Sequence, residues 1–214
     1  MIEIFGRRSA FNVQKVLWTI GELALPHRHV AAGGAAGGLD TPAFLAMNPH
    51  GRIPVLCDGD TTIWESHSIV RYLAARYAPG VLFALDPAER SLADRWMDWA
   101  QTTLQPDFMQ LFWSFYRTPE ADRNVRRIDA AAKHCVLHFG RLDRHLAEHR
   151  FLAGEQLTMG DIPAATALYR YFEMGVSTPD VPNVRRWYAA LAERAPYREH
   201  IMRPFDELRG RLAF

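Results

Sequence analysis

Apolar residues follow two different periods along the chain, and the change of period divides it into two parts. Segments typical of β-strands occur in the first part, at residues 2–5, 27–30, 53–57 and 61–64. Helical spacing of apolar residues predicts one helix that begins at Phe11 and another that begins near Ser66. The order strand–helix–strand, followed by strand–strand–helix, predicts an α/β domain. The glycine-rich stretch at residues 31–44, between the two groups, is expected to lack regular structure.

The second part, from Asp86 on, shows helical periodicity and no convincing strand. A long helical pattern starts at Asp86, and Pro106 is expected to kink or split it. A further helix has one apolar stripe that should face the core, formed by Val125, Ile128, Ala132, Val136, Phe139, Leu142 and Leu146. A shorter helix is predicted over residues 183–193, and the residues from Pro196 on are expected to form a tail.

Residues 157–162 carry the signature of a helix start. The Thr158 side chain can accept a hydrogen bond from the backbone amide of Asp161, and the Asp161 carboxylate can accept one from the amide of Thr158. Leu157 is expected to pack on Ile162. This capping box has a role in folding and predicts another helix at this point.

The region of residues 48–73 combines a turn, a hairpin and a helix start. Residues 58–60, Asp-Gly-Asp, are a strong hairpin signal. Pro54 cannot donate to a sheet and is a candidate for a cis peptide bond. At the helix start, Glu65 and Ser66 would present a carboxylate, a hydroxyl and free backbone amides. That combination suits a ligand that carries both an ammonium and a carboxylate.

Two motifs of this region, NPHGRIPVL followed by ESHSIVRYL, closely resemble the glutathione-binding half of the cytosolic glutathione transferases. The resemblance extends over nearly the whole chain, and the segment RRSAFNVQKV resembles the serine-type, theta-like bacterial branch. It implies a thioredoxin-like α/β domain over residues 1–78, a linker over residues 79–85 and an all-helical domain over residues 86–214.

The resemblance implies six glutathione-binding residues: His50, Arg52, Ile53, Pro54, Glu65 and Ser66. The backbone of Ile53, held by the following proline, would pair with the cysteinyl backbone of glutathione. Glu65 and Ser66 would hold the γ-glutamyl ammonium and carboxylate. His50 and Arg52 would line the glycine end, where lysine is more common than the arginine found here.

Two residues compete for the contact with the glutathione sulfur. Ser9 stands at the junction of loop and helix, where a serine often only caps the helix. In the family, a serine, tyrosine or cysteine at this junction contacts the sulfur, whereas Asn12 occupies a position thought to share or take over that role in some bacterial relatives. The sequence leaves both residues as candidates for thiol activation.

The resemblance also places a second-substrate pocket in the helical part. An aromatic cluster is the expected wall of this electrophile pocket: Phe112, Trp113, Phe115 and Tyr116. The electrophile is therefore expected to be small and apolar. Family members are usually homodimers, so a homodimer is expected.

Composition narrows the remaining possibilities. Hydrophobic residues make up 49% of the chain, and Lys+Arg 25 against Asp+Glu 24 gives a net charge of +1, which implies no nucleic-acid partner. No signal peptide and no membrane-spanning run is evident, so a cytoplasmic location is expected. Two histidine pairs lie four residues apart, His134/His138 and His145/His149, but further ligands for a metal are not evident. Cys57 and Cys135 are expected to be structural.

The resemblance implies a glutathione S-transferase that adds the glutathione thiolate to a small apolar electrophile. A glutathione-dependent disulfide reductase is an alternative, because some relatives without an active-site cysteine carry out that reaction. A non-catalytic glutathione-binding or scaffold protein is a third possibility, because folds of this kind are reused without their activity.

Overall fold

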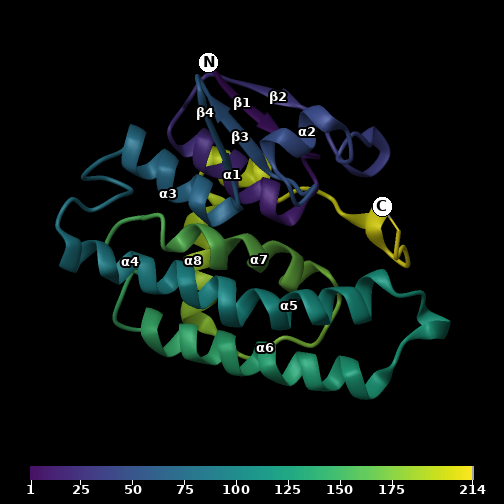
Figure 1. Ribbon diagram of the computed structural model, residues 1–214. Coiled ribbons are helices and arrows are strands. Elements are labelled where there is room, and N and C mark those ends of the chain that lie inside the picture. The colour runs from purple at the N-terminus through teal and green to yellow at the C-terminus, as the bar shows by residue number, and fades with distance from the viewer. Residues whose placement is uncertain (214) are drawn as a thin grey trace.

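A computed structural model describes residues 1–213 of the protein (Figure 1). Its sheet has four strands in the order β2-β1-β3-β4, namely β1 (Ile2–Phe5), β2 (His27–Val30), β3 (Val55–Asp58) and β4 (Thr61–Trp64). β1 is parallel to β2 and antiparallel to β3, and β3 and β4 form the expected hairpin. The expected α/β arrangement is confirmed. β3 begins two residues later than predicted, after the cis Ile53–Pro54 bond, which is also as expected.

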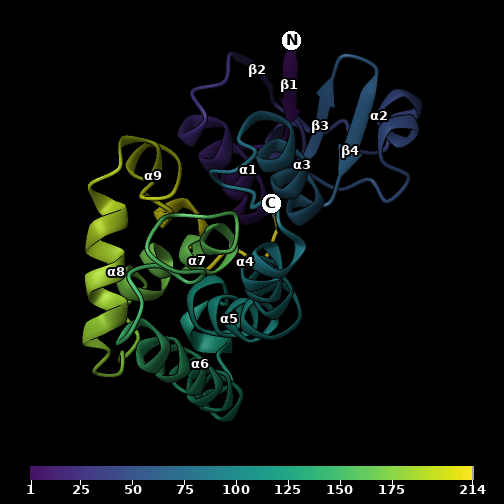
Figure 2. The same cartoon turned by 90° about the vertical axis from the view of Figure 1, so that its left-hand side faces the viewer.

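Helices cover both faces of this sheet: α1 (Phe11–Glu22), α2 (Pro42–Met47) and α3 (Ser66–Tyr77). α1 and α3 pack on one face through a core that includes Val16, Leu56 and Ile69, and α2 packs on the other through Phe44. Figure 2 shows α1 and α3 on one side of the sheet and α2 on the other. The sheet core is therefore closed on both sides.

The α2 helix corrects one expectation. It occupies the end of the glycine-rich stretch at residues 31–44, which was expected to lack regular structure. The Thr41 side chain accepts a hydrogen bond of 3.3 Å from the amide of Phe44, and Pro42 occupies the first turn. Threonine at the cap and proline in the first turn are common at helix starts. The helix was not predicted because the preceding glycines favour a loop.

From Pro87 on, the described chain is mostly helical. The helices are α4 (Pro87–Trp99), α5 (Gln105–Leu111), α6 (Val125–Leu146), α7 (Asp161–Glu173), α8 (Pro182–Ala192) and α9 (Ala195–His200). The segment from Pro196 on, expected as a short tail, begins within the α9 helix. The expected disturbance at Pro106 takes the form of a π-helical segment, Ala100–Leu104, directly before α5. A wider turn of this kind accommodates a residue without an amide hydrogen.

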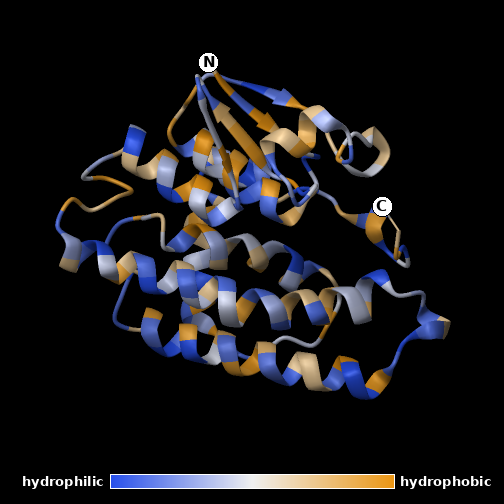
Figure 3. Ribbon diagram, in the orientation of Figure 1, coloured by the Kyte–Doolittle hydropathy of each residue, from blue (hydrophilic) through white to orange (hydrophobic). Residues whose placement is uncertain are grey.

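The buried face of α6 differs from the predicted stripe. Ala131, Cys135 and His138 are buried, together with Phe139, Leu142 and Leu146. Val125 and Val136 belong to the predicted stripe but are 67% and 39% exposed. Along α6, polar and apolar residues alternate in Figure 3, as expected for an amphipathic helix. Small and polar residues complete its inner face, and apolar periodicity alone did not identify them.

The capping box before α7 is present with one change of partner. The Asp161 carboxylate accepts a hydrogen bond of 2.9 Å from the Thr158 amide and a second, also of 2.9 Å, from the amide of Leu152. The Thr158 hydroxyl accepts from the amide of Gly160 rather than from that of Asp161. Asp161 is fully buried, so it connects the loop at Leu152 to the first turn of α7.

We expect Asp161→Ala to destabilise the protein by about 2 kcal/mol or more, because the buried amide of Leu152 and the partly buried amide of Thr158 both lose their acceptor. Thr158→Ala should cost about 0.5–1 kcal/mol, since it removes one cap at the edge of the helix. Denaturant unfolding of both variants measures these costs. Turnover per folded molecule should stay at the wild-type value. A lower turnover number with an unchanged unfolding midpoint would show that the box acts in the reaction.

α1 is the helix that joins the two parts of the molecule. Its residues Phe11 and Trp18 belong to the same buried core as the helices from α4 to α8. The Gln14 side chain donates a hydrogen bond of 2.9 Å to the carbonyl of His200, and Glu22 pairs with Arg194 at 2.6 Å. The first turn of α1 therefore has a fixed position relative to both the sheet and the helical part.

Candidate functional site

A cavity of about 210 Å³ lies where the first turns of α1 and α3 meet the helical part. It is lined by Asn12, Asn48, Arg52, Ile53, Pro54, Glu65, Ser66, Gln101 and Gln105. Six of these residues belong to the predicted site: Asn12, Arg52, Ile53, Pro54, Glu65 and Ser66. The structure therefore brings together residues from the loop before β3, the end of β4 and α1. Two predicted residues, Ser9 and His50, do not line this cavity.

Glu65 and Ser66 lie at the start of α3. Ser66 is the first residue of the helix and is 3% exposed, whereas Glu65 is exposed. Glu65 has a φ of 69°, a backbone conformation that costs a residue other than glycine about 1–3 kcal/mol. The free amides of the first turn and the positive end of the helix dipole attract an anion, and the Glu65 carboxylate attracts a cation. This helix start can therefore hold both ends of a zwitterionic group.

Asn48 fixes the loop that carries Arg52 and Ile53. Its side-chain amide donates a hydrogen bond of 2.8 Å to the carbonyl of Arg52, and its oxygen accepts one of 3.1 Å from the amide of His50. The sequence showed Asn48 only as a turn former. Because it is 3% exposed and lines the cavity, it is a supporting residue of the site that sequence reasoning missed.

His50 lies outside the cavity. Its imidazole is exposed, and its ring lies 5.0 Å from the ring of Trp64 in an edge-on arrangement. The neighbouring Arg52 side chain is also exposed but does line the cavity. Of the two residues expected at the glycine end, the structure therefore places only Arg52 at the cavity.

The side-chain amide of Asn12 has a defined orientation. Its oxygen lies 3.0 Å from the ammonium nitrogen of Lys15 and 3.4 Å from the side-chain nitrogen of Gln105. An ammonium group can only donate hydrogen bonds, so the atom that faces it must be the oxygen. The NH₂ group of Asn12 is consequently the end of the amide that remains for a ligand in the cavity.

Lys15 is a second residue that sequence reasoning missed. A lysine is usually exposed, and this one stands among the apolar residues of a helical pattern. In the structure it is 0% exposed, and burial lowers its pKa to about 7, an effect that the Glu65 carboxylate partly opposes. It lies between α1, α3 and α5, beside the cavity. Among the residues that line the cavity, Arg52 is the one with a positively charged side chain.

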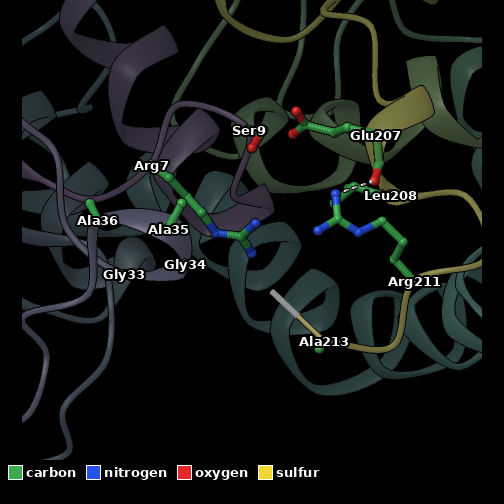
Figure 4. A pocket seen from close by; sticks show the side chains of 10 residues that line it. All are labelled: Arg7, Ser9, Gly33, Gly34, Ala35, Ala36, Glu207, Leu208, Arg211 and Ala213. Atoms are coloured by element: carbon green, nitrogen blue, oxygen red, sulfur yellow. Dashed lines mark hydrogen bonds between the residues drawn. The ribbon is translucent and has the colours of Figure 1, made fainter.

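Ser9 faces a different cavity, of about 270 Å³, between the first loop and the C-terminal segment. Figure 4 shows the side chains of Arg7 and Arg211 extending into this cavity, with Ser9 and Glu207 at one side. Ser9 does not cap α1, because Ala10 holds the cap position and no side chain caps the helix. The Ser9 carbonyl accepts a hydrogen bond of 2.7 Å from Arg170.

The aromatic cluster lies mainly in the helical core. Phe112 and Tyr116 are each 1% exposed, and their rings stack with centroids 5.3 Å apart. Trp113 and Phe115 are half-buried, and the guanidinium groups of Arg117 and Arg123 lie over their rings. This placement argues against Phe112 and Tyr116 as pocket walls, because side chains this deeply buried do not reach a ligand. The clustering of aromatic residues in the sequence is compatible with a core as well as with a pocket wall, and in the structure Phe112 and Tyr116 belong to the core.

The histidines and cysteines form neither a metal site nor a disulfide among residues 1–213. Among residues 1–213, no group of three or more His, Cys, Asp or Glu side chains is arranged to hold a metal ion. His138 contacts the Asp107 carboxylate at 2.7 Å. Cys135 is buried, and burial raises the pKa of its thiol to about 12, so it is not a nucleophile at neutral pH. Cys57 lies in β3, outside the cavity.

Two family models match the chain, one for each part of the fold. Residues 4–80 match the N-terminal domain of glutathione S-transferases, and residues 104–195 match the C-terminal domain. The chain belongs to the glutathione S-transferase family. Its four-stranded α/β part and its helical part are the two domains of that family's fold. The expected family and fold class are thereby confirmed.

Named relatives agree with this assignment. The chain is 41% identical to glutathione S-transferase GstB of Escherichia coli K12 over 95% of its length and 99% of that protein. It is 27% identical to glutathione S-transferase 3 of Zea mays, over 94% and 93% of the two chains. A solved theta class glutathione S-transferase from Xanthomonas axonopodis pv. citri, with glutathione bound, is 45% identical, with a TM-score of 0.90 over 95% of this chain and 98% of that one.

Within residues 1–213, no helix is both long enough and apolar enough to cross a membrane.

Proposed function

We propose that the protein is a glutathione S-transferase that binds glutathione in the cavity between α1, α3 and the loop before β3. The observation that carries this proposal is the meeting of Glu65, Ser66 and the Asn12 amide in one cavity. Glu65 would hold the γ-glutamyl ammonium, and the amides at the start of α3 would hold the γ-glutamyl carboxylate. The backbone of Ile53 would pair with the cysteinyl unit, and Arg52 would attract the glycine carboxylate.

Asn12 is proposed as the residue that stabilises the glutathione thiolate. Its NH₂ group remains for a ligand in the same cavity as the residues assigned to the γ-glutamyl end. Ser9, the other candidate, lines the neighbouring cavity. Both residues lie near the start of α1, whose free amides add to the attraction for an anion. Ser9 therefore stays the alternative, and the Discussion sets out how the two are separated.

The chemistry needs the thiol to ionise near neutral pH. A free thiol has a pKa near ~8.5, and lowering it by about two units takes roughly 2.7 kcal/mol. A hydrogen bond to a charged group contributes ~1.5–3 kcal/mol, and a helix start adds up to ~1 kcal/mol. The thiol proton passes to solvent, and a sulfur lone pair forms the new C–S bond. The displaced bonding electrons leave with the leaving group of the electrophile.

The electrophile is proposed to enter the cavity beside Ser9. This cavity lies next to the start of α1, and its wall combines small residues from the segment 33–36 with Arg7 and Arg211. The aromatic cluster was the ground for expecting an apolar electrophile, and the burial of Phe112 and Tyr116 leaves only the half-buried Trp113 and Phe115 to support it. The wall of the proposed cavity favours an electrophile that also carries polar groups.

Three further properties are carried over from the family as proposals. The first is a homodimer, whose test is a light-scattering mass of twice the 24.4 kDa of one chain. The second is a cytoplasmic location with a role in detoxification. The third is the division into domains at residues 1–78 and 86–214, with the linker between α3 and α4. Nucleic acid and membranes are not proposed as partners.

A turnover assay tests the proposed activity against its two rivals. The purified protein is given glutathione with a chlorinated nitroaromatic compound, and separately with hydroxyethyl disulfide. Conjugation of the aromatic compound supports the transferase. Turnover of the disulfide alone would establish a glutathione-dependent disulfide reductase instead. Binding of glutathione without turnover of either compound would leave a non-catalytic glutathione-binding protein.

A further inference from the structure

The environment of Lys15 combines deep burial with three polar contacts. Its ammonium nitrogen lies 3.0 Å from the Asn12 oxygen and 3.0 Å from Nε2 of His67, and it also donates to the side-chain oxygen of Gln105. It lies 4.9 Å from the centroid of the Phe11 ring. The three donors of the ammonium therefore have three acceptors, which come from α1, α3 and α5.

These acceptors are uncharged. Burial, together with the charges of Lys15 and Arg71, holds the pKa of His67 well below its usual range, so the imidazole is neutral and accepts through Nε2. Asn12 and Gln105 carry no charge, and the Glu65 carboxylate acts on Lys15 only through its charge, without a hydrogen bond to it. A buried ammonium without a paired carboxylate in contact reduces stability, and an apolar side chain of similar volume would avoid that cost. Stability alone therefore does not account for a lysine at this position.

The contact with Asn12 gives the ammonium a role in the reaction. An asparagine amide can turn by half a rotation about its last bond, which exchanges its oxygen and its nitrogen. Protonated Lys15 can only donate hydrogen bonds, so in its charged form it faces the Asn12 oxygen and selects one of the two orientations. In that orientation the NH₂ group of Asn12 is directed away from Lys15 and can donate to an anion in the cavity.

We propose that Lys15 is a positioning residue for thiol activation: its buried ammonium holds the Asn12 oxygen, so that the Asn12 NH₂ group faces the sulfur of bound glutathione. The inference rests on the proposed function, because it assigns a role within the glutathione site. Lys15 itself does not contact the substrate. It acts through Asn12, and that distinction can be measured.

A double-mutant cycle tests the inference with four proteins: wild type, Lys15→Met, Asn12→Ala and the double variant. The readouts are the pKa of the bound thiol, from ultraviolet titration of the thiolate, and kcat/KM at pH 7. Lys15→Met should raise the thiol pKa by about one unit and lower kcat/KM about tenfold. The calorimetric glutathione Kd should change by about twofold or less. In the Asn12→Ala background, Lys15→Met should change the thiol pKa no further.

Two results would overturn the inference. One is an unchanged thiol pKa in folded Lys15→Met. The other is an equal effect of Lys15→Met with and without Asn12, which would mean that the ammonium acts on the sulfur directly. Failure of the proposed function gives a different result, because the wild-type protein itself would then show no bound thiolate. Lys15→Gln covers the case in which Lys15→Met does not fold. It removes the ammonium, and it too should raise the thiol pKa.

Gln14→Leu is the matched control on the same helix. Gln14 is also buried, but it contacts the carbonyl of His200 and the guanidinium of Arg170, which in turn donates to the Ser9 carbonyl. This variant should lower the melting temperature and leave the thiol pKa unchanged. A raised thiol pKa in Gln14→Leu combined with an unchanged one in Lys15→Met would place control of ionisation on the Ser9 side of α1 and contradict the inference.

Discussion

Glu65→Ala is expected to weaken glutathione binding by about 2 kcal/mol or more, which is roughly thirtyfold in Kd. The reason is that the γ-glutamyl ammonium would lose its carboxylate partner at the start of α3, where Glu65 lines the cavity. Isothermal titration calorimetry measures the change directly. A folded Glu65→Ala protein with wild-type affinity would remove Glu65 from the site.

Two variants at the same position separate the charge of Glu65 from its backbone conformation. Glu65→Gln keeps the length of the side chain and loses the charge, so it should weaken binding nearly as much as alanine does. Glu65→Gly should also weaken binding. Because glycine adopts the φ of 69° without strain, it should be more stable to unfolding than Glu65→Ala by about 1 kcal/mol. Equal stability of the glycine and alanine variants would contradict the strain assigned to Glu65.

Asn12→Ala is expected to raise the pKa of the bound glutathione thiol by about one to two units. The loss of a hydrogen bond to the thiolate, worth ~1.5–3 kcal/mol, accounts for this range. The rate of conjugation at pH 7 should fall about ten- to a hundredfold. Ultraviolet titration of the bound thiolate and steady-state kinetics measure the two quantities, and the glutathione Kd should stay close to the wild-type value.

Ser9→Ala is the comparison that decides between the two candidates. Since Ser9 lines the neighbouring cavity, we expect its loss to leave the thiol pKa nearly unchanged. A raised thiol pKa in Ser9→Ala with a normal one in Asn12→Ala would transfer the role to the serine. If neither variant changed the pKa, the helix start would be the activator and the assignment of Asn12 would be wrong.

Much of the fold follows from local sequence signals. The strands at Ile2–Phe5, His27–Val30 and Thr61–Trp64 have the bounds that the pattern of residues predicts, and the helix at Val125–Leu146 spans the residues of the predicted apolar stripe. These segments are flanked by clear turn residues or helix caps, so their ends are determined locally. The region from Asn48 to Ser66 also follows from local signals, because its turn, hairpin and helix start are adjacent in the sequence.

Other features depend on contacts between distant segments, and the sequence did not reveal them. Lys15 is buried because helices far along the chain close over it, and a helical period cannot distinguish such a lysine from an exposed one. Gln105 reaches Asn12 from 93 residues away. Phe112 and Tyr116 likewise pack on Phe205, near the end of the chain, instead of lining a pocket.

A crystal structure of the protein with glutathione bound tests the central proposal most directly. The proposal predicts the γ-glutamyl ammonium at the Glu65 carboxylate and the sulfur within about 3.5 Å of the side-chain nitrogen of Asn12, as expected for a hydrogen bond to sulfur. Lys15 should keep its contact with the Asn12 oxygen in that complex. A sulfur bound at the Ser9 hydroxyl and out of reach of Asn12, or glutathione bound outside this cavity, would contradict the proposal.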